Sequence, residues 1–256
     1  MSSSLQKSLS ILELLAKTPS PMPLRDIAVH LDSPPATVHR LLKLLSNAGY
    51  VRQDRSNNDY YLSLKLASLG LIGLSNTGIH GVAQPLLDRM AAETGELVRL
   101  GLIENERLVF IAKAAVARYG LRYDPDAGQE APLCCTASGQ AWLLNLTDEE
   151  ALRIVTRQGL PPKGTHGPNA PATIQEFLAD LTEARKRGYG LNINASMDGI
   201  TAIAVPIIPP KHLPVVGVLA ISGPSSRLTR EIAETFLPMM KKEAEELSGI
   251  TLYPTL

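Results

Sequence analysis

The chain has 256 residues, with 25 Lys and Arg against 25 Asp and Glu, and 45% of its residues are hydrophobic. This length and apolar content are enough for two small domains with buried cores, and they exclude the composition of a disordered chain. A formal net charge of zero excludes a chain that is basic throughout, as a non-specific polyanion binder would be. The charge therefore has to be counted segment by segment before a nucleic-acid partner is excluded.

The two cysteines and the N-terminal residues indicate the cellular compartment in which the protein is expected. Cys134 and Cys135 are adjacent, and neighbouring cysteines rarely meet the geometry of a disulfide bond, so a reducing, intracellular compartment is expected. Residues 1–7 lack a basic segment followed by an apolar core, and the chain has no run of 18 apolar residues. We expect a cytoplasmic protein with no membrane partner.

Three short helices and a hairpin are predicted at the N-terminal end. Apolar residues recur three and four apart over 7–16, which predicts an amphipathic helix, and a second helix follows over 24–31. A turn with a serine and two prolines then opens a third helix over 35–48. Two strand-like runs, 50–53 and 60–63, flank six residues that favour turns. This order of elements is that of a winged helix-turn-helix.

The rest of the chain predicts a linker helix and then a mixture of strands and helices. Helices are expected at 64–74, 82–94, 136–146, 148–156, 174–187 and 229–248, and strands at 97–103, 108–114, 201–208 and 215–221. The loop between the last two strands is too short for a crossover helix, so antiparallel neighbours are expected. The predicted fold class is α+β. Its parts are a winged helix-turn-helix domain over 1–63, a linker helix over 64–81 and an α/β domain over 82–256.

The third predicted helix has an apolar stripe and a polar face. Val38, Leu41, Leu42 and Leu45 form the stripe, and the polar face offers the long cations and the hydroxyl group that major-groove recognition uses. Two arginines of the hairpin are placed to reach phosphates or the minor groove. The candidate DNA contacts are Arg25, Pro35, Ala36, Thr37, His39, Arg40, Lys43, Arg52 and Arg55.

The charge of the N-terminal segment agrees with this interpretation. Residues 1–60 hold seven Lys and Arg against five Asp and Glu, so the remainder carries an excess of two acidic residues. The excess of two cations is small, but four of the seven lie between Arg40 and Arg55. A solvated helix face is the usual explanation for such charges. The order of helices, turn and hairpin favours DNA binding instead, although winged helices also serve as protein-interaction modules.

Short sequence blocks occur in a recognisable order along almost the whole chain. They lie at 8–15, 24–28, 36–42 and 49–51, and then at 131–141, 187–189, 202–206 and 221–229. In this order they resemble the isocitrate lyase regulator (IclR) family of bacterial transcription factors, with coverage from about residue 5 to residue 250. Each block alone is weak, whereas the ordered set is specific.

The resemblance implies a winged-helix domain, a linker helix and a GAF-like α/β effector-binding domain that takes a small, often carboxylate-bearing metabolite. It also implies homodimers, commonly paired into tetramers, on palindromic operators in double-stranded DNA, because a two-fold dimer presents the same helix to each half-site. The expected function is a repressor of a catabolic operon that uses no cofactor. A hydrolase or isomerase with an appended winged helix is the alternative.

Carried over position by position, the resemblance places the effector site at Cys134, Ala137, Ser138, Asn192, Asn194, Ala202, Ala220 and Ser222. Several of these residues are smaller or less polar than the family's usual ones. We therefore expect a ligand larger than a two-carbon oxo acid, such as an aromatic or aliphatic carboxylate, a sugar acid or a lactone-derived acid. Backbone N–H groups after Thr136, helped by Ser138, are expected to hold its acid group.

A catalytic or metal site is the competing interpretation of Cys134. A nucleophilic thiolate needs a neighbouring base, and the five histidines, His30, His39, His80, His166 and His212, form no recognisable catalytic signature. A zinc site built from Cys134 with His166 or His212 lacks close ligand spacing. We expect neither site. Core packing is expected for both cysteines and for Trp142.

Overall fold

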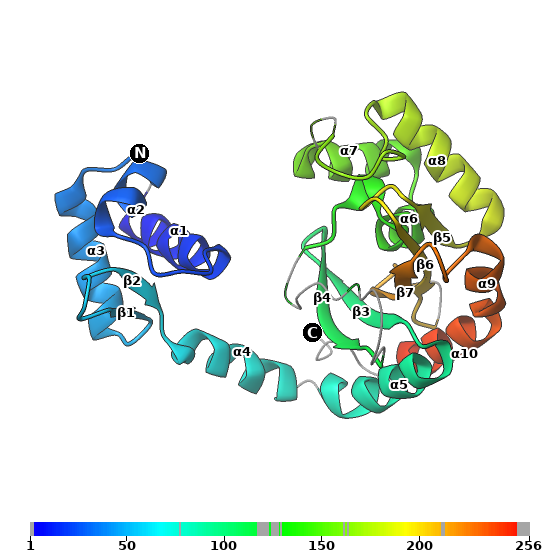
Figure 1. Cartoon of the computed structure of the whole chain (residues 1–256), viewed down its shortest axis with the longest axis horizontal. Coiled ribbons are helices and arrows are strands. Elements are labelled where there is room, and N and C mark those ends of the chain that lie inside the picture. Colours follow the sequence, from blue (N-terminus) through cyan, green and yellow to red (C-terminus); the bar gives the residue numbers. More distant parts are fainter. Residues whose placement is uncertain are drawn as a thin grey trace. The chain divides into compact units, whose positions relative to one another are not determined.

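The chain divides into two compact units, Met1–Asn76 and Thr77–Leu256, shown in Figure 1. The structure is a computed structural model that describes residues 3–76, 78–116, 123, 128, 130–160, 162, 164–210 and 213–249. Over these residues, no helix combines the length and the apolar character needed to cross a membrane.

The N-terminal unit begins with the three predicted helices, α1 (Ser4–Lys17), α2 (Leu24–His30) and α3 (Pro35–Asn47). The Ser3 side chain caps α1 by accepting a hydrogen bond from the third backbone N–H of the helix. Proline at the first position of α3 fits a site where no N–H is needed. After α3 the chain turns through Gly49, whose φ of 81° favours glycine. All three predictions are confirmed to within a few residues.

The predicted hairpin is also confirmed. β1 (Val51–Gln53) pairs antiparallel with β2 (Tyr60–Leu62). The turn between them is held by Asp54, whose Oδ1 accepts the backbone N–H of Ser56 at 2.8 Å and its hydroxyl at 2.7 Å. The core of the unit joins α1, α2, α3 and the hairpin through Ile11, Leu15, Ile27, Ala28, Val38, Leu41, Leu42, Leu45, Val51 and Tyr60.

The unit ends with α4 (Leu64–Asn76), which corresponds to the predicted linker helix. None of the described residues of α4 is buried.

The C-terminal unit contains a five-stranded, fully antiparallel sheet in the order β4-β3-β7-β6-β5. Its strands are β3 (Leu97–Glu104), β4 (Arg107–Ala114), β5 (Gly190–Ile193), β6 (Ile200–Ile207) and β7 (Gly217–Pro224). The predicted antiparallel arrangement is confirmed, but β5 was not predicted. This edge strand is only four residues long and contains glycine and asparagine, which are poor strand formers. The Leu191 N–H on β5 donates to Gln140 Oε1 at 2.9 Å.

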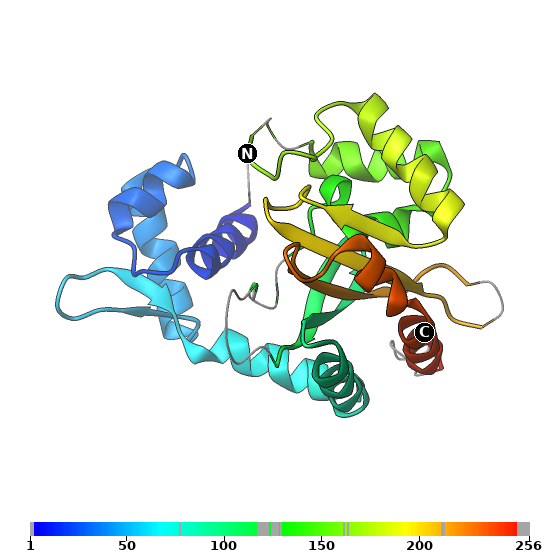
Figure 2. The same cartoon turned by 45° about the vertical axis from the view of Figure 1, so that its right-hand side comes forward.

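Helices cover both faces of this sheet (Figure 2). The helices are α5 (Ile79–Thr94), α6 (Ala137–Leu143), α7 (Asp148–Gln158), α8 (Ile174–Arg187), α9 (Arg230–Thr235) and α10 (Leu237–Ser248), with a 3-10 turn η1 over Leu133–Cys135. The helices α6, α7 and α8 share a core with one face of the sheet, and α5 and α10 contact the sheet as well. The prediction of a single helix over 229–248 is wrong. The helix breaks at Phe236, because Pro238 has no N–H with which to continue it. Pro238 lies instead in the first turn of α10, where no N–H is needed.

Two glycines let α6 approach its neighbours at backbone distance. A Cβ on Gly190 of β5 would overlap the carbonyl oxygen of Ala137, and one on Gly139 would overlap that of Leu133. Glycine is required at both places because any larger residue would push α6 away from β5 and η1. The first turn of α6 is thereby fixed against the face of the sheet that carries Ala202, Ala220 and the residues discussed next.

Candidate functional site

Eight of the nine predicted DNA contacts lie on α3 and the hairpin, and the ninth, Arg25, lies on α2. Thr37 is half-buried, and the other eight are exposed. The four residues of the apolar stripe are buried beneath them. The division of α3 into a buried and an exposed face is therefore confirmed, while contact with DNA stays a prediction.

The cations of this surface have no acidic partner among the described residues. No ion pair within the described part of the chain involves Arg25, Arg40, Lys43, Arg52 or Arg55. The only side-chain hydrogen bond that the structure gives Arg40 is a long one of 3.5 Å to the Ser4 hydroxyl. These side chains are available to phosphates or base edges.

Sequence reasoning missed one cation near this surface. Lys7 Nζ on α1 donates to Ser33 Oγ at 2.9 Å, in the turn immediately before α3. The two residues are 26 positions apart, so no local pattern brings them together. The contact places a positive charge beside the start of α3.

In the C-terminal unit, three predicted effector residues form one row across neighbouring strands. Asn192 of β5 is opposite Ala202 of β6, which is opposite Ser222 of β7. Ala220 lies two residues before Ser222 on the same face, and it is opposite Ala204. The small side chains of Ala202, Ala204 and Ala220 belong to the core shared with α6, α7 and α8.

The amide of Asn192 is used within the protein. Its Nδ2 donates to the Cys135 carbonyl, and its Oδ1 accepts the backbone N–H groups of Ala195 and Ser196 at 3.1 and 3.2 Å. Asn192 is buried. These bonds tie β5 to η1 and to the turn that follows β5, which is a structural task whether or not a ligand also touches the residue.

Asn194 lies beyond the end of β5 and does not join this row. Its φ is 55°, and its Oδ1 accepts the Gly199 N–H at 2.9 Å and the Ser225 hydroxyl at 3.2 Å. The side chain therefore organises the turn between β5 and β6. Its predicted role in binding an effector has no support in this geometry.

The remaining predicted effector residues lie on η1 and α6. Cys134, Ala137 and Ser138 are all buried. The expectation that backbone N–H groups of α6 hold an anion is weakened, because Thr136 Oγ1 already accepts the Gly139 N–H at 3.0 Å and α6 has only seven residues. A short, capped helix has little N-terminal potential left for a ligand.

The structure adds a residue that the sequence prediction left out. Arg99, in the middle of β3, is only 9% exposed, and its Nε has no hydrogen-bond partner. Its guanidinium carbon lies 3.8 Å from the centroid of the Phe110 ring. Burial lowers the pKa of Arg99, because the charged form is poorly solvated there. An arginine between apolar neighbours in a strand was the available signal, but only the sheet register shows which face it occupies.

Ser222 is a second buried polar group without a partner. The residue is 1% exposed, and its Oγ makes no hydrogen bond. Arg99 is opposite Ala220, two residues before Ser222, so both unpartnered groups lie on the same face of adjacent strands. Buried polar groups are normally hydrogen-bonded, so this pair requires an explanation.

Neither of the alternative chemistries considered for Cys134 finds support. The hydrogen bond between the two thiols lowers the pKa of Cys134 and, together with burial, raises that of Cys135. A nucleophilic thiolate also needs a neighbouring base, and no hydrogen bond from a base to Cys134 is seen among the described residues. Cys134 and His166 line the same cavity of about 230 Å³. His166 Nδ1 is 3.3 Å from the Ser196 carbonyl oxygen, and among the described residues no hydrogen bond joins His166 to Cys134. Among the described residues no group of His, Cys, Asp and Glu suits a metal, and His212 lies outside them.

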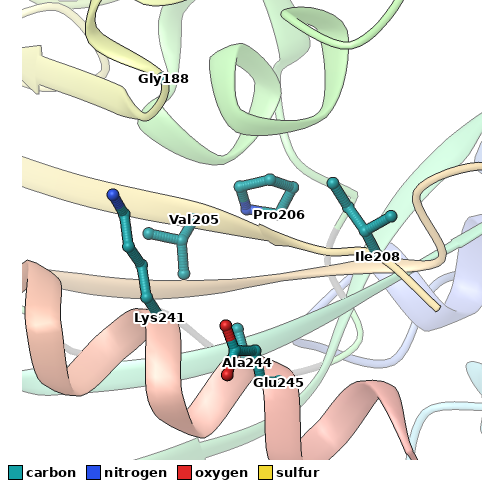
Figure 3. A pocket seen from close by; sticks show the side chains of 7 residues that line it. All are labelled: Gly188, Val205, Pro206, Ile208, Lys241, Ala244 and Glu245. Carbon is teal, nitrogen blue, oxygen red and sulfur yellow. The ribbon is translucent and has the colours of Figure 1, made fainter. Parts of the chain in front are cut away.

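A separate cavity of about 320 Å³ lies beside the part of β6 that extends past β5. Figure 3 shows Val205 and Pro206 of β6 and Ile208, just after the strand, together with Lys241 and Glu245 of α10. It contains none of the predicted effector residues, and it is not continuous with the row described above.

Two family models together match most of the chain. Residues 4–55 match the IclR helix-turn-helix domain, and residues 72–249 match the bacterial transcriptional regulator IclR C-terminal domain. The chain belongs to the IclR family. The resemblance inferred from the sequence blocks is therefore confirmed, as is the fold of an N-terminal helix-turn-helix domain followed by an α/β domain.

Relatives of this IclR-family regulator cover nearly its whole length. The HTH-type transcriptional repressor AllR of Escherichia coli (strain K12) is 28% identical over 253 residues, covering 98% of this chain and 92% of that protein. The probable transcriptional regulator SauR of Cupriavidus necator is 26% identical over 241 residues, covering 94% of each.

Solved structures agree with the fold. An IclR transcriptional regulator from Alicyclobacillus acidocaldarius superposes with a TM-score of 0.82 at 26% identity, covering 98% of this chain and 99% of that one. An IclR homologue from Microbacterium hydrocarbonoxydans, complexed with 4-hydroxybenzoate, has a TM-score of 0.76 at 20% identity, covering 96% and 98%.

These findings establish the general activity of this IclR-family regulator. It is a DNA-binding transcriptional regulator with an IclR-type helix-turn-helix and an effector-binding domain. The alternative of a hydrolase or isomerase with an appended winged helix is not favoured, because the relatives are named as transcriptional regulators.

Proposed function

We propose that this protein represses a catabolic operon by binding a palindromic operator in double-stranded DNA as a homodimer. The observation that carries the proposal is the set of exposed cations on α3 and the hairpin, none of which has an ion-pair partner among the described residues. In the complex, α3 enters the major groove and Arg52 and Arg55 contact the backbone or the minor groove. Such a regulator works where bacterial DNA is, in the cytoplasm.

The dimer is supported by the apolar surface of α4. Leu64, Leu71 and Ile72 are 85%, 65% and 55% exposed, and they line a shallow groove along this helix. Exposed apolar side chains grouped on one element mark a contact surface. A second copy of the same helix is the occupant we propose, because a two-fold contact would also pair the α3 helices for a palindrome. Pairing of dimers into tetramers is part of the same proposal.

We further propose that the effector is a small organic acid bound at the face of the sheet that carries Ala202, Ala220 and Ser222. The alanines leave more room than larger polar residues would, which favours an acid larger than a two-carbon oxo acid. The likeness to the 4-hydroxybenzoate complex is too distant to carry the ligand, so this proposal rests on the residues of the present chain. The effector acts by preferring one arrangement of the paired α3 helices, coupled through α4.

A gel-shift experiment tests the proposed function. The probe is the DNA upstream of the gene for this protein, and the control is a shuffled duplex of equal length and composition. A sequence-specific shift at moderate salt, altered by one member of a panel of small acids, is the expected result. Equal affinity for the two duplexes at moderate salt would remove the proposal, because binding through phosphates alone does not distinguish them.

A thermal-shift panel tests the size of the ligand. Glyoxylate and pyruvate are compared with larger aromatic and aliphatic acids at matched concentrations. We expect stabilisation by larger acids only, since a ligand that binds the folded state raises the melting temperature. Stabilisation by glyoxylate or pyruvate, with no response to the larger acids, would contradict the expectation.

A further inference from the structure

The two cysteines of the chain form a pair of thiols beside a cavity. Cys134 and Cys135 are both buried in the 3-10 turn η1, and they are the only cysteines of the sequence. Their side chains share a hydrogen bond, and Cys134 lines the cavity of about 230 Å³. Two sulfur atoms are therefore held together at the wall of a space large enough for a small molecule.

The shared hydrogen bond gives the two thiols different properties. It lowers the pKa of Cys134, and the same bond and then burial raise the pKa of Cys135. Cys134 thus loses its proton more readily than an ordinary thiol, and the Cys135 thiol stabilises the thiolate by donating to it. The thiolate is the form of cysteine that binds soft atoms. The pair is suited to hold one soft atom through both sulfurs.

The backbone on either side of the pair is fixed. The Cys135 carbonyl accepts a hydrogen bond from Asn192 Nδ2 on β5. The Leu133 N–H, at the start of η1, donates to Gln158 Oε1 on α7 at 2.7 Å. A ligand that needs both sulfurs at once therefore loses less conformational entropy here than on a flexible chain.

Neither a disulfide bond nor a bare metal ion suits this pair. Adjacent Cα atoms are about 3.8 Å apart, whereas the Cα atoms of a disulfide are usually about 4.4–6.8 Å apart. A structural zinc ion takes four protein ligands, and among the residues that the structure describes no group of three or more His, Cys, Asp and Glu could hold a metal. The ligand that remains is a soft atom that takes two sulfurs from the protein and carries a substituent of its own.

We propose that Cys134 and Cys135 form a chelating dithiol site for a monosubstituted trivalent arsenical, R–As(OH)2. Each thiol displaces one hydroxyl group, so two As–O bonds break, two As–S bonds form, and the two thiol protons leave in two molecules of water. Arsenic stays trivalent, and the exchange needs no oxidant, reductant or catalytic base. The substituent R lies in the cavity, next to Pro132, Gly159 and His166. This inference goes beyond the proposed function and does not rest on it.

The alternative is that the two cysteines only fill space in the core. Burial agrees with both roles, and the adjacent cysteines of an unfolded chain are able to bind an arsenical as well. The melting temperature separates the two roles. A ligand that prefers the folded state raises the melting temperature, whereas one that binds only the unfolded chain lowers it.

The experiment uses the full chain with phenylarsine oxide, whose hydrated form is the R–As(OH)2 species. Native mass spectrometry of the wild type should detect one phenylarsenic group per chain, and the melting temperature should rise. The adduct should resist an excess of the monothiol 2-mercaptoethanol and be removed by the dithiol 2,3-dimercaptopropanol, because only a second chelator competes with two sulfurs that act together.

Variants with one thiol provide the matched control. Cys134→Ser and Cys135→Ser should each bind phenylarsine oxide about 100-fold or more weakly, because the second thiol no longer acts at a high effective concentration. Where a serine prevents folding, Cys134→Ala and Cys135→Ala make the same test with an apolar side chain.

Three results would overturn the inference. They are a lowered melting temperature of the wild type with the arsenical, an adduct that the monothiol removes as readily as the dithiol, and wild-type affinity in a variant with one thiol. The wild-type measurements decide the matter even where no variant folds. All three results would leave the operator gel shift unaffected, so failure here is distinguishable from failure of the proposed function.

Discussion

The two units of this protein place arginine in opposite environments. On α3, Arg40 is exposed and has no acidic partner, and on β3, Arg99 is buried and has none either. An exposed cation costs little to fold and attracts any phosphate backbone in a salt-dependent way. A buried cation destabilises the folded chain until an anion binds, and then contributes strongly to affinity and selectivity. Burial thus distinguishes the two arginines: Arg40 is open to a phosphate backbone, whereas Arg99 lies inside the fold with an unpartnered Nε.

The cores differ in a parallel way. The N-terminal unit buries branched aliphatic residues between α1, α2 and α3 and leaves its polar groups at the surface. The C-terminal unit buries alanines, two cysteines and unpartnered polar atoms beside its sheet. A core of the first kind is built for stability. The second core also contains large apolar side chains such as Phe110, Trp142 and Phe177. The two cores belong to separate compact units, so damage to each should have separable consequences.

Loss of a core side chain in the N-terminal unit is the largest effect we expect. Leu42→Ala removes a fully buried side chain of α3, and it should lower the free energy of unfolding of that unit by about 2–5 kcal/mol. Operator binding should fall with it, while the melting transition of the C-terminal unit stays in place. Calorimetry with a parallel gel shift measures both.

Leu44→Ala is the matched control for that experiment. Leu44 is on the same helix but 53% exposed, so the variant should change stability by less than about 0.5 kcal/mol. If Leu42→Ala shifts both melting transitions by the same amount, the two units unfold cooperatively and the comparison between them fails.

Arg40→Ala tests the role of the exposed arginine on α3, and its expected effect is smaller than that of Leu42→Ala. Loss of a bidentate contact to a base should weaken operator binding by about 1–3 kcal/mol and relax the sequence preference. Arg52→Ala, if that side chain contacts a phosphate, should weaken binding equally on all sequences and reduce the salt slope by about one. Fluorescence anisotropy at several salt concentrations measures both quantities.

Arg153→Ala is the control for these arginine variants. Arg153 is in an ion pair with Glu106 on the C-terminal unit, and its loss should leave the DNA affinity unchanged. Equal losses in Arg40→Ala and Arg52→Ala on every duplex would show that Arg40 contributes charge only and reads no base.

The sequence predicted those elements whose patterns are local. The apolar spacing of α3, the turn residues before it and the loop of the hairpin are each contained within a few residues, and the corresponding elements formed. Elements that depend on distant partners were missed or misjudged. The strand β5 forms because β6 and Gln140 provide its partners, and the break between α9 and α10 depends on one proline within an otherwise helical pattern.

The candidate sites show the same division. The exposed face of α3 follows from helical periodicity, and the predicted contacts on α3 are exposed except for the half-buried Thr37, while contact with DNA stays a prediction. The effector positions came from family resemblance, which gives positions and not surroundings. It gave no indication that the Asn194 side chain accepts hydrogen bonds within the turn after β5, or that Arg99 is buried with an unpartnered Nε. The burial of Arg99 depends on the sheet register, and a strand with apolar residues on both faces does not reveal which face a charge occupies.

The smallest effect we expect is at the surface of the C-terminal unit. Tyr189 donates a hydrogen bond of 2.6 Å to Glu234 Oε1, and Arg230 Nε donates another of 2.8 Å to the same oxygen. The Tyr189 hydroxyl and then Arg230 lower the pKa of the Glu234 carboxyl. Tyr189→Phe should cost about 0.5–1 kcal/mol near neutral pH, because Arg230 still satisfies the carboxylate.

The stabilisation by the Tyr189–Glu234 hydrogen bond should decrease as the pH falls. A carboxyl group whose pKa is lowered by folding stabilises the protein above its unfolded pKa, and that contribution is lost as the pH falls through the folded value. The difference between wild type and Tyr189→Phe should therefore be full at pH 7 and shrink below about pH 4, near the ordinary glutamate pKa. Urea unfolding at both pH values measures it. As a control, Tyr61→Phe on the exposed face of β2 should change the free energy of unfolding equally at both pH values. If Tyr189→Phe also lowers it equally at both, the Tyr189 hydroxyl stabilises the unit through packing and not through the charge of Glu234.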